Sequence, residues 1–506
     1  MSNTRDNDTT RFPDPTYART VLGPLFDHSK KEFAGPLGLI NRAHCVMLTE
    51  TGILSPDDGA SIAGALSTIE TRLDPAQMSY TGQFEDLFFF IEAELKTLIG
   101  PDLAGRLHTG RSRNDMDHTI FRMKLREKID GLSAAGRTLA QAILAKAEAE
   151  RDTIIVAYTH GQPAQPTTFG HYLCAALEVL LRDLERLDAA RTVVDRSPMG
   201  AAAITTTGFP LDRARMAELL GFAEVQRNSY GCIATVDYVT ATYSALSLMV
   251  MHLGRLVQDL QVWTSFEVAQ LYVPNSFVQI SSIMPQKRNP VPIEHLRLLG
   301  SMAMGQADGM IKTMHNTPFT DMNDSEGEVQ IAGYTAFANA GRMVDLLAAL
   351  LPHLSVQADR VSANLDRSSI TVTELADTLV RNEGLAFRQA HEIAADVARG
   401  VVARNAPLSE GFELFEHAFG QTVGRPSRLS VQDYRHAVSA ENFIAVRNRP
   451  GGPAPEAMRD SLSVYRGQLD DLVQRAATNA DRAAAAQAAL TTSFSRLAGS
   501  AQNKEA

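Results

Sequence analysis

The segment from His108 to Asp115 carries side chains suited to binding an anion. Its sequence, His-Thr-Gly-Arg-Ser-Arg-Asn-Asp, places two arginines, two hydroxyls and an amide around one glycine, immediately before a long predicted helix. Backbone N–H groups at a helix start and fork-shaped guanidinium groups both bind carboxylate or phosphate. The alternative is that Ser112, Asn114 or Asp115 only caps the helix. Both interpretations stay open for this segment taken alone.

A second polar segment, residues 158–168, contains a histidine in a proline-rich setting. It reads Tyr-Thr-His-Gly-Gln-Pro-Ala-Gln-Pro-Thr-Thr, and we expect Pro163 and Pro166 to keep it as an extended loop. His160 has the side chain best suited to proton transfer near neutral pH. A single loop histidine is more often structural, so this segment alone leaves its role open.

The third polar segment, residues 281–290, combines two hydroxyls, a cation and an amide in the sequence Ser-Ser-Ile-Met-Pro-Gln-Lys-Arg-Asn-Pro. Pro290 or Pro292 can open the helix that follows. A surface turn is the plain alternative. Against it, residues 275–289 form a long polar connection between two apolar helices, and long loops in compact proteins are often lids or binding loops.

Motifs for several other kinds of chemistry are absent. The sequence has no G-x-x-x-x-G-K-[ST], G-x-G-x-x-G or G-x-S-x-G motif, so nucleotide cradles and hydrolase nucleophile elbows have no support. No histidine and cysteine pairing has zinc spacing, and the thirteen histidines are scattered. We therefore expect no metal.

Composition excludes several broad classes of protein. With 506 residues, of which 44% are hydrophobic and 21% charged, the chain is too apolar for wholesale disorder. A net charge of −10 argues against nucleic-acid binding. No apolar run approaches the roughly 20 residues of a membrane span, and the N-terminus lacks a signal peptide's apolar core. Three scattered cysteines do not suggest a disulfide framework, so we expect a cytoplasmic protein.

Long helices are predicted to position the three polar segments. Between Val236 and Leu260 apolar residues recur at alternating steps of three and four, and nearby residues widen the stripe around most of the helix. A helix apolar nearly all round belongs inside a bundle. Strand signals are scarce, so the sequence predicts an all-α protein. Four further stretches have similar helical patterns, at about residues 115–151, 168–191, 292–314 and 329–351.

Punctuation by glycine, proline and polar residues divides the predicted helices into three helical domains. The first covers residues 1–111. The second, residues 112–365, holds the longest helices as a central bundle, together with the loop at 275–290. The third, residues 366–506, has shorter helices and then an alanine-rich final helix.

Together the three segments resemble the fumarase/aspartase superfamily, and within it the argininosuccinate lyase branch. The superfamily signature G-S-x-x-M-x-x-K-x-N matches from Ser281 to Asn289, with Ile280 in place of its leading glycine. T-G-R-S-R-N-D at 109–115 is nearly diagnostic of the branch. The second segment, continued as F-G-H-Y, also matches a branch pattern. The resemblance spans roughly residues 20–480.

This resemblance implies a particular assembly and reaction. Members are homotetramers in which the central helices form a twenty-helix bundle, and each active site is built from the three segments on three different subunits. The shared reaction is reversible elimination of fumarate from a succinyl-bearing small molecule, without metal or organic cofactor. By similarity, then, we expect neither a nucleic-acid nor a membrane partner.

The resemblance also assigns roles to individual residues. Ser281 is implied as the base that removes the Cβ proton, and Lys287 as a cation that stabilises the developing carboxylate charge. His160 is implied in protonating the leaving group, with Glu294 as its carboxylate partner. A serine can serve as a base only if its anion is stabilised by N–H donors and a nearby cation. The implied substrate-binding residues are Thr109, Ser112, Arg113, Asn114, Thr159, Gln165, Ser282, Met284 and Asn289.

The amine half of the substrate is less clear, because the chain departs from the branch where arginine is held. Argininosuccinate lyases commonly read A-Y-N-K-D-L-Q-E-D-K there, whereas residues 320–329 read Thr-Asp-Met-Asn-Asp-Ser-Glu-Gly-Glu-Val. The tyrosine becomes Asp321, the glutamine Glu326 and the lysine Val329. Asp86 lies in a stretch where the family's E-D-x-H here ends in phenylalanine. Asp86, Asp321 and Glu326 are therefore candidates for the amine end, and the lost lysine should weaken binding of an arginine carboxylate.

We therefore predict a carbon–nitrogen lyase for an N-substituted L-aspartate other than argininosuccinate, such as the aminopolycarboxylate ethylenediamine-disuccinate. One tension remains, since a second succinyl arm would favour basic residues, and a cationic amine fits the acidic segment better. Structural drift is the alternative account, which leaves an argininosuccinate lyase. A non-catalytic, crystallin-like homologue is a further alternative. A nucleotide-succinate substrate is disfavoured by T-G-R-S-R-N-D.

Overall fold

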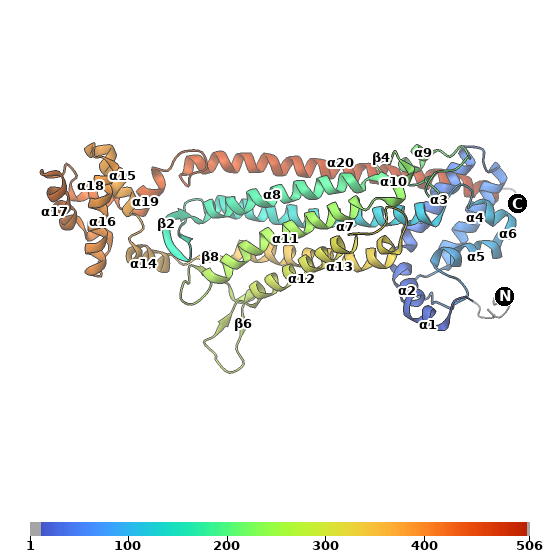
Figure 1. Ribbon diagram of the computed structural model, residues 1–506, viewed down its shortest axis with the longest axis horizontal. Helices are drawn as coiled ribbons and strands as arrows, with labels where there is room; N and C mark the ends of the chain where they lie inside the picture. The colour runs from blue at the N-terminus through green and yellow to red at the C-terminus, as the bar shows by residue number, and fades with distance from the viewer. Residues whose placement is uncertain (1–11, 503–506) are drawn as a thin grey trace, which may run out of the picture.

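The long amphipathic stretches of the sequence form helices that pack side by side along most of the molecule. The computed structural model describes residues 12–502. Successive helices of the bundle run in opposite directions, so the loops between them lie alternately at one end of the bundle and at the other (Figure 1). The all-α class and the long central helices predicted from the sequence are both confirmed. The five helices are α7 (Arg113–Ala149), α8 (Phe169–Val194), α11 (Asp237–Trp263), α12 (Val291–Thr313) and α13 (Gly327–Leu350).

Local sequence sets where these helices begin. Ser112 caps α7, and the Ser112 N–H donates in return to the Asp115 carboxylate at 2.8 Å, which completes a capping box. Thr168 caps α8 by accepting a hydrogen bond from the His171 N–H at 3.0 Å. Pro292 occupies the first turn of α12, where a missing N–H costs nothing.

Shorter helices gather at the bundle end where α7 begins (Figure 1). Here the buried side chains of α3 and α4 join the core of the bundle. These elements are α1 (Pro15–Tyr17), the π-helix η1 (Ala18–Leu22), α2 (Gly23–Glu32), α3 (Ala34–Glu50), α4 (Pro56–Arg72), α5 (Leu87–Ile99), α6 (Pro101–Arg106), α9 (Arg213–Leu219), α10 (Ser229–Ala234) and the 3₁₀ turn η3 (Asn323–Ser325).

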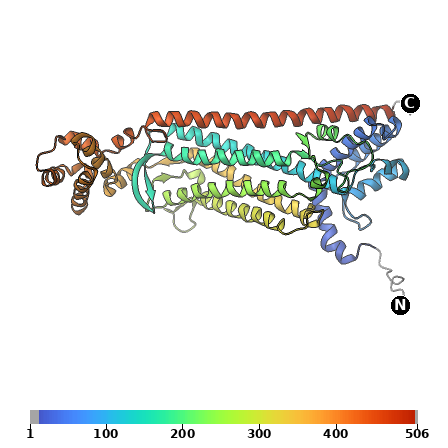
Figure 2. The ribbon, with the colours of Figure 1, turned by 45° about the horizontal axis from the view of Figure 1, so that its top comes forward.

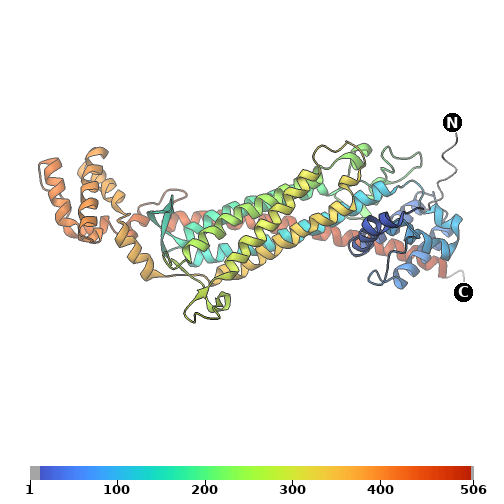
Figure 3. The ribbon, with the colours of Figure 1, turned by 60° about the horizontal axis from the view of Figure 1, so that its bottom comes forward.

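A group of helices with its own hydrophobic core lies beyond the opposite end of the bundle (Figure 3). Leu379, Ile393, Phe415 and Phe419 are fully buried in that core. The elements from η4 onward at this end are η4 (Leu351–His353), α14 (Ala358–Ser368), α15 (Val372–Glu383), α16 (Phe387–Ala403), η5 (Leu408–Glu410), α17 (Phe412–Val423), α18 (Val431–Ala437) and α19 (Ala440–Ala445).

The last helix, α20 (Pro455–Gln502), returns along the whole bundle (Figure 2). It packs on α8 and α7 and then reaches α4 and α3 at the far end. Leu462, Leu469, Leu472 and Leu490 are buried there. The predicted division at residues 111 and 365 stays a prediction, as does the tetramer; within one chain, α20 joins both ends of the bundle.

Strands are short and form four two-stranded sheets in the described part of the chain. The strands pair in the order β1 (Ile154–Thr159) with β2 (Gln162–Thr168), β3 (Arg196–Ser197) with β4 (Glu224–Val225), β5 (Leu271–Tyr272) with β8 (Ser355–Val356), and β6 (Gln279–Ile280) with β7 (Arg288–Asn289). The 3₁₀ turn η2 (Asn275–Phe277) lies between β5 and β6.

The hairpin of β1 and β2 corrects one expectation, since an extended loop was predicted for residues 158–168. His160 and Gly161 both have positive φ, of 55° and 74°, as a two-residue hairpin turn requires. In a two-stranded sheet each strand is an edge, so Pro163 and Pro166 are tolerated without a ladder N–H. The prolines therefore do not prevent pairing.

Within residues 12–502, no helix combines the length and apolarity needed to cross a membrane. The cytoplasmic location stays a prediction.

Gly170 should be essential where α7 ends and α8 begins. A Cβ there would lie 2.7 Å from Arg151 Cα and closer still to the Ala147 carbonyl oxygen, and neither backbone can move freely. We expect Gly170→Ala to lower the free energy of unfolding by about 1–3 kcal/mol. Gly131→Ala, in the exposed middle of α7 with nothing within 4 Å, is the control and should gain up to about 1 kcal/mol. Chemical denaturation of both variants measures the difference; equal stabilities would contradict the packing argument.

Candidate active-site segments

The first polar segment is fixed against α3 by buried polar contacts. The Nε2 atom of His44 lies 2.9 Å from the Thr109 carbonyl oxygen. Buried Arg111 donates to Asn41 at 2.7 Å. Burial and the neighbouring Arg111 charge lower the pKa of His44, so its ring is neutral near pH 7. Thr109, a predicted substrate-binding residue, is thus held from its backbone while its side chain stays partly accessible.

Asp115 connects the start of α7 to a separate loop. Its carboxylate is fully buried and accepts hydrogen bonds from the backbone N–H groups of Ser112, Gly200 and Ala202, at 2.8, 2.9 and 2.9 Å. Burial raises the pKa of Asp115 to about 6, an effect that these N–H donors oppose. Beside it, the Asn114 side-chain amide donates to the Ala203 carbonyl at 3.1 Å. Asp115 therefore does more than cap the helix.

Arg113 is committed to two carboxylates rather than standing free. Its Nη1 atom lies 3.0 Å from a Glu85 oxygen and 2.8 Å from an Asp86 oxygen. Asp86 also caps α5 by accepting the Phe89 N–H at 2.9 Å. The predicted substrate-binding residue Arg113 and the predicted amine-end residue Asp86 are therefore direct neighbours.

A cavity of about 560 Å³ brings the first segment and the acidic segment together. Its apolar lining comes from η1, α2, α3, α5 and α7, and its polar lining mainly from residues 85–86, the start of α7 and residues 321–328. All three predicted amine-end residues line it. The polar and charged residues of these three stretches are Glu85, Asp86, Arg113, Asn114, Asp117, Asp321, Asn323, Glu326 and Glu328.

Two residues of this region, Asp117 and His118, were missed by the sequence analysis. Both follow Asn114 at three and four positions along α7, so the helical repeat places them on the same face. That spacing was a usable signal. The Nε2 atom of fully buried His118 lies 3.8 Å from an Asp321 oxygen. The pairing of α7 with the start of α13 could not be read from spacing.

Crowding of carboxyl groups determines their protonation. Burial, reinforced by the Asp86 and Asp321 charges, raises the pKa of Asp117 to about 8. Burial together with Asp117 and Asp321 raises the pKa of Glu326 well above its usual range. The adjacent His118 lowers the pKa of Asp321, and burial lowers the pKa of His118. These effects favour the protonated forms of Asp117 and Glu326, the charged carboxylate of Asp321 and the neutral imidazole of His118.

The second segment presents its predicted residues on the β1–β2 hairpin. His160 occupies the turn, Thr159 the end of β1 and Gln165 the middle of β2, and all three are exposed. The hairpin lies at the end of the bundle opposite the first segment (Figure 1).

The third segment forms a projecting loop between β6 and β7 (Figure 1). Arg288 anchors its base by donating to the Val273 carbonyl and the Asn275 side chain, both at 2.8 Å. The Ser281 Oγ atom accepts hydrogen bonds from the backbone N–H groups of Met284, at 3.1 Å, and Ile283, at 3.4 Å. These are the donors that a serine anion would need.

The other predicted residues of this loop are mostly open to solvent. Ser282, Met284 and Lys287 are exposed, Asn289 is partly exposed in β7, and Glu294 is exposed on the first turn of α12. In one chain this loop lies near the hairpin end of the bundle, away from the cavity beside the first segment (Figure 3). A single chain therefore does not bring the three segments together.

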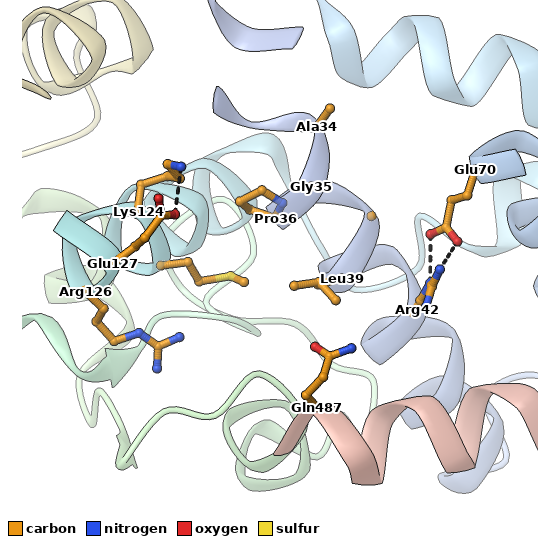
Figure 4. Close-up of a pocket in the computed structure, with 12 residues that line it drawn as sticks. Ala34, Gly35, Pro36, Leu39, Arg42, Glu70, Lys124, Arg126, Glu127 and Gln487 are labelled. Carbon is orange, nitrogen blue, oxygen red and sulfur yellow. Dashed lines mark hydrogen bonds and ion pairs between the residues drawn. The ribbon is translucent and has the colours of Figure 1, made fainter. Parts of the chain in front are cut away.

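Figure 4 shows a second cavity, of about 620 Å³, between α3, α7 and α20. Four of its charged side chains pair with each other: Arg42 donates to Glu70 at 2.8 Å, and Lys124 donates to Glu127 at 2.8 Å. The fifth, Arg126, pairs with Asp195 at 3.0 Å. No predicted site residue is among those that line it.

Removing the Asp115 carboxylate should loosen the first segment. Asp115→Ala would leave the buried N–H of Gly200 and the partly buried N–H groups of Ser112 and Ala202 without their acceptor, and a buried group in that state costs about 1–3 kcal/mol. We expect the free energy of unfolding to fall by at least about 2 kcal/mol in denaturant titrations. Asp152→Ala, which removes an exposed carboxylate at the far end of α7, should change it by less than about 0.5 kcal/mol. If both variants change the free energy of unfolding by a similarly small amount, the Asp115 carboxylate does not hold the first segment in place.

Comparison with known proteins shows which family the chain belongs to. Residues 50–305 match the family described as Lyase, and residues 369–445 match the one described as Argininosuccinate lyase C-terminal. Argininosuccinate lyase 2 of Agrobacterium fabrum is 59% identical over 98% of this chain and 99% of its own. Argininosuccinate lyase 1 of Shouchella clausii is 33% identical over 86% and 89%.

A solved structure is similar along almost the full length. The crystal structure of EDDS lyase in complex with formate has a TM-score of 0.84 at 29% identity, over 97% of this chain and 99% of that one. The chain therefore belongs to the argininosuccinate lyase family of the fumarase/aspartase superfamily and is a carbon–nitrogen lyase that releases fumarate.

Proposed function

We propose that this lyase eliminates fumarate reversibly from an N-substituted L-aspartate whose amine half is not arginine, such as ethylenediamine-disuccinate. One observation carries the proposal: Arg113 and Asn114 of the succinyl-binding segment line the same cavity as Asp117, Asp321 and Glu326. A substrate bound by its succinyl half at the start of α7 would therefore direct its amine half at carboxyl groups.

The charges of this cavity disfavour an arginine product. Six carboxyl groups and one guanidinium line the cavity, and the guanidinium of Arg113 already contacts two of these carboxyls. The six come from Glu85, Asp86, Asp117, Asp321, Glu326 and Glu328. The α-carboxylate of arginine would meet like charge without a free cation. A cationic amine would instead find acceptors.

The proposed chemistry begins at the third segment. Ser281 removes the Cβ proton of the aspartyl moiety, and the electron pair moves onto the adjacent carboxylate as an aci-carboxylate. Backbone N–H groups of Met284 and Ile283 stabilise the serine oxygen, and Lys287 and Asn289 hold the charged carboxylate. The C–N bond then breaks, the amine nitrogen takes a proton, and fumarate and amine are released.

The remaining predicted residues complete this proposal. Thr109, Ser112, Asn114 and Thr159 bind the succinyl carboxylates. His160, paired with Glu294, assists protonation of the leaving amine. The other binding residues by similarity are Arg113, Gln165, Ser282 and Met284.

We further propose a homotetramer with each active site shared by three subunits. The support is geometric: the hairpin of His160 and the loop of Ser281 lie away from the cavity beside Arg113 within one chain (Figures 1 and 3). All three segments are needed for the proposed elimination, so other copies must supply two of them.

Argininosuccinate lyase activity is the second candidate. The observation that favours it is the 59% identity to a protein named argininosuccinate lyase 2 over nearly the whole chain. In that case the acidic residues of the cavity would be neutral sequence changes that do not alter which substrate is bound.

Replacing Ser281 tests its role as the base. Ser281→Ala should lower kcat for fumarate release by about 10²–10⁴-fold, the usual contribution of a general base, while the size of the assembly in gel filtration stays unchanged. Ser282→Ala is the matched control, and should mainly raise KM because it removes a binding hydroxyl only. Retained kcat in Ser281→Ala would exclude serine as the base.

The substrate is tested by following fumarate absorbance with argininosuccinate and ethylenediamine-disuccinate side by side. We expect release from the diamine compound and little from argininosuccinate, because the cavity is acidic. Release from argininosuccinate alone would overturn the proposal in favour of the second candidate. If neither compound releases fumarate but other N-substituted aspartates do, ethylenediamine-disuccinate is rejected as the substrate and the proposed reaction class is retained.

A further inference from the structure

Three potential metal ligands converge beside the acidic cavity, which Asp321 and Glu326 line and next to which His118 is fully buried. His118 comes from α7, Asp321 from the segment before η3, and Glu326 from the cap of α13. One ligand atom from each side chain lies within 4.8 Å of the other two. No other such group of three histidine, cysteine or carboxylate side chains occurs in residues 12–502.

His118 is aimed into this group and lacks a partner there. Its side chain is fully buried, and its Nδ1 atom is hydrogen-bonded to the Tyr238 hydroxyl at 3.2 Å. The Nε2 atom, on the opposite side of the ring, has no hydrogen bond to any described residue, since Asp321 Oδ1 is 3.8 Å away. That Oδ1 atom is itself buried without a hydrogen-bond partner in the described chain. Two buried polar atoms that face each other without a hydrogen bond mark a place for a water or an ion.

Supporting contacts orient His118 as metal-binding histidines are oriented. In the tautomer in which Nδ1–H donates to Tyr238, the Nε2 lone pair points at the two carboxyls, and such a second hydrogen bond fixes the ring of a ligating histidine. Tyr238 is itself buried, with the Arg122 guanidinium carbon 4.2 Å from its ring centroid. The imidazole therefore cannot turn away without breaking a buried contact.

The carboxyl groups of the cavity also outnumber its basic side chains. The guanidinium of Arg113 contacts Glu85 and Asp86, which leaves Asp117, Asp321 and Glu326 without a basic side chain of their own. Imidazole nitrogen and carboxylate oxygen are both ligands of zinc, and catalytic zinc sites use three protein ligands and keep a fourth position open.

We propose that His118, Asp321 and Glu326 bind a divalent transition-metal ion, such as Zn²⁺, at the amine end of the active-site cavity. The sequence analysis expected no metal, because the three ligands lie far apart in the chain and match no spacing motif. Packing of α13 against α7 brings them together.

Such an ion would explain how an acidic cavity accepts a substrate that carries further carboxylates. This consequence rests on the proposed function. An aminopolycarboxylate carries further carboxylates, and the acidic segment offers them no basic side chain. A metal with three protein ligands keeps open positions toward the cavity, where an amine or carboxylate of the amine half can bind.

The site is tested by calorimetric titration of the intact protein with Zn²⁺. Bound metal is first removed with a chelator, and the chelator is then removed. We expect one saturable zinc site per chain. Zinc should bind at least about tenfold more weakly to Asp321→Asn and His118→Gln, because mutation of residues that only support the ligands already lowers metal affinity by roughly 10–100-fold. Circular dichroism checks the fold. Asp321 is only partly buried, so Asp321→Asn keeps the test valid if the buried His118 variant does not fold.

Glu328→Gln is the matched control, because Glu328 lines the same cavity but lies outside the group of three. Loss of this one exposed charge should change zinc affinity by less than about fivefold. The proposal is overturned by absence of saturable binding, by unchanged affinity in Asp321→Asn, or by an equal loss in Glu328→Gln, which would indicate diffuse attraction.

The titration contains no substrate, so its result is separate from the proposed function. Zinc binding as described, without fumarate release from any N-substituted aspartate, would overturn only the proposed function. Fumarate release without a zinc site would overturn only this inference.

Discussion

The buried carboxylate of Asp115 is the contact on which the arrangement at the start of α7 depends. It satisfies three backbone N–H groups from two separate parts of the chain, and a buried N–H without an acceptor is costly. This contact fixes the helix start relative to the loop around Gly200 and Ala202. The side chains on the first two turns of α7, including Arg113 and Asp117, are positioned as a consequence.

Local chemistry explains which features could be predicted from sequence. The start of α7 follows from a serine and an aspartate three residues apart, and the long helices follow from apolar spacing, because both depend on neighbours in the chain. The β1–β2 hairpin was missed because a His-Gly turn was not recognised as equivalent to the usual Asn-Gly turn. Its prolines were interpreted as holding an extended loop, but both strands are edges, where a missing ladder N–H is tolerated.

Features that depend on packing between distant elements could not be predicted in this way. The family resemblance indicated Asp321 and Glu326, but their approach to His118 arises only when α13 packs against α7. The return of α20 along the bundle is a similar case, because its alanine-rich sequence specifies a helix but not the surface against which that helix packs. The roles of Ser281 and His160 stay predictions, and a single chain keeps them apart from the cavity.

The length and path of α20 have a consequence for the order in which the chain folds during synthesis. At about 1.5 Å per residue, its 48 residues span roughly 70 Å, so it covers α8, α7 and α4 in one stretch. The ribosome makes this helix after every element that it covers. The apolar side chains beneath α20 therefore stay exposed until residues 455–502 have been made, and exposed apolar surface of this kind makes a nascent bundle prone to aggregation.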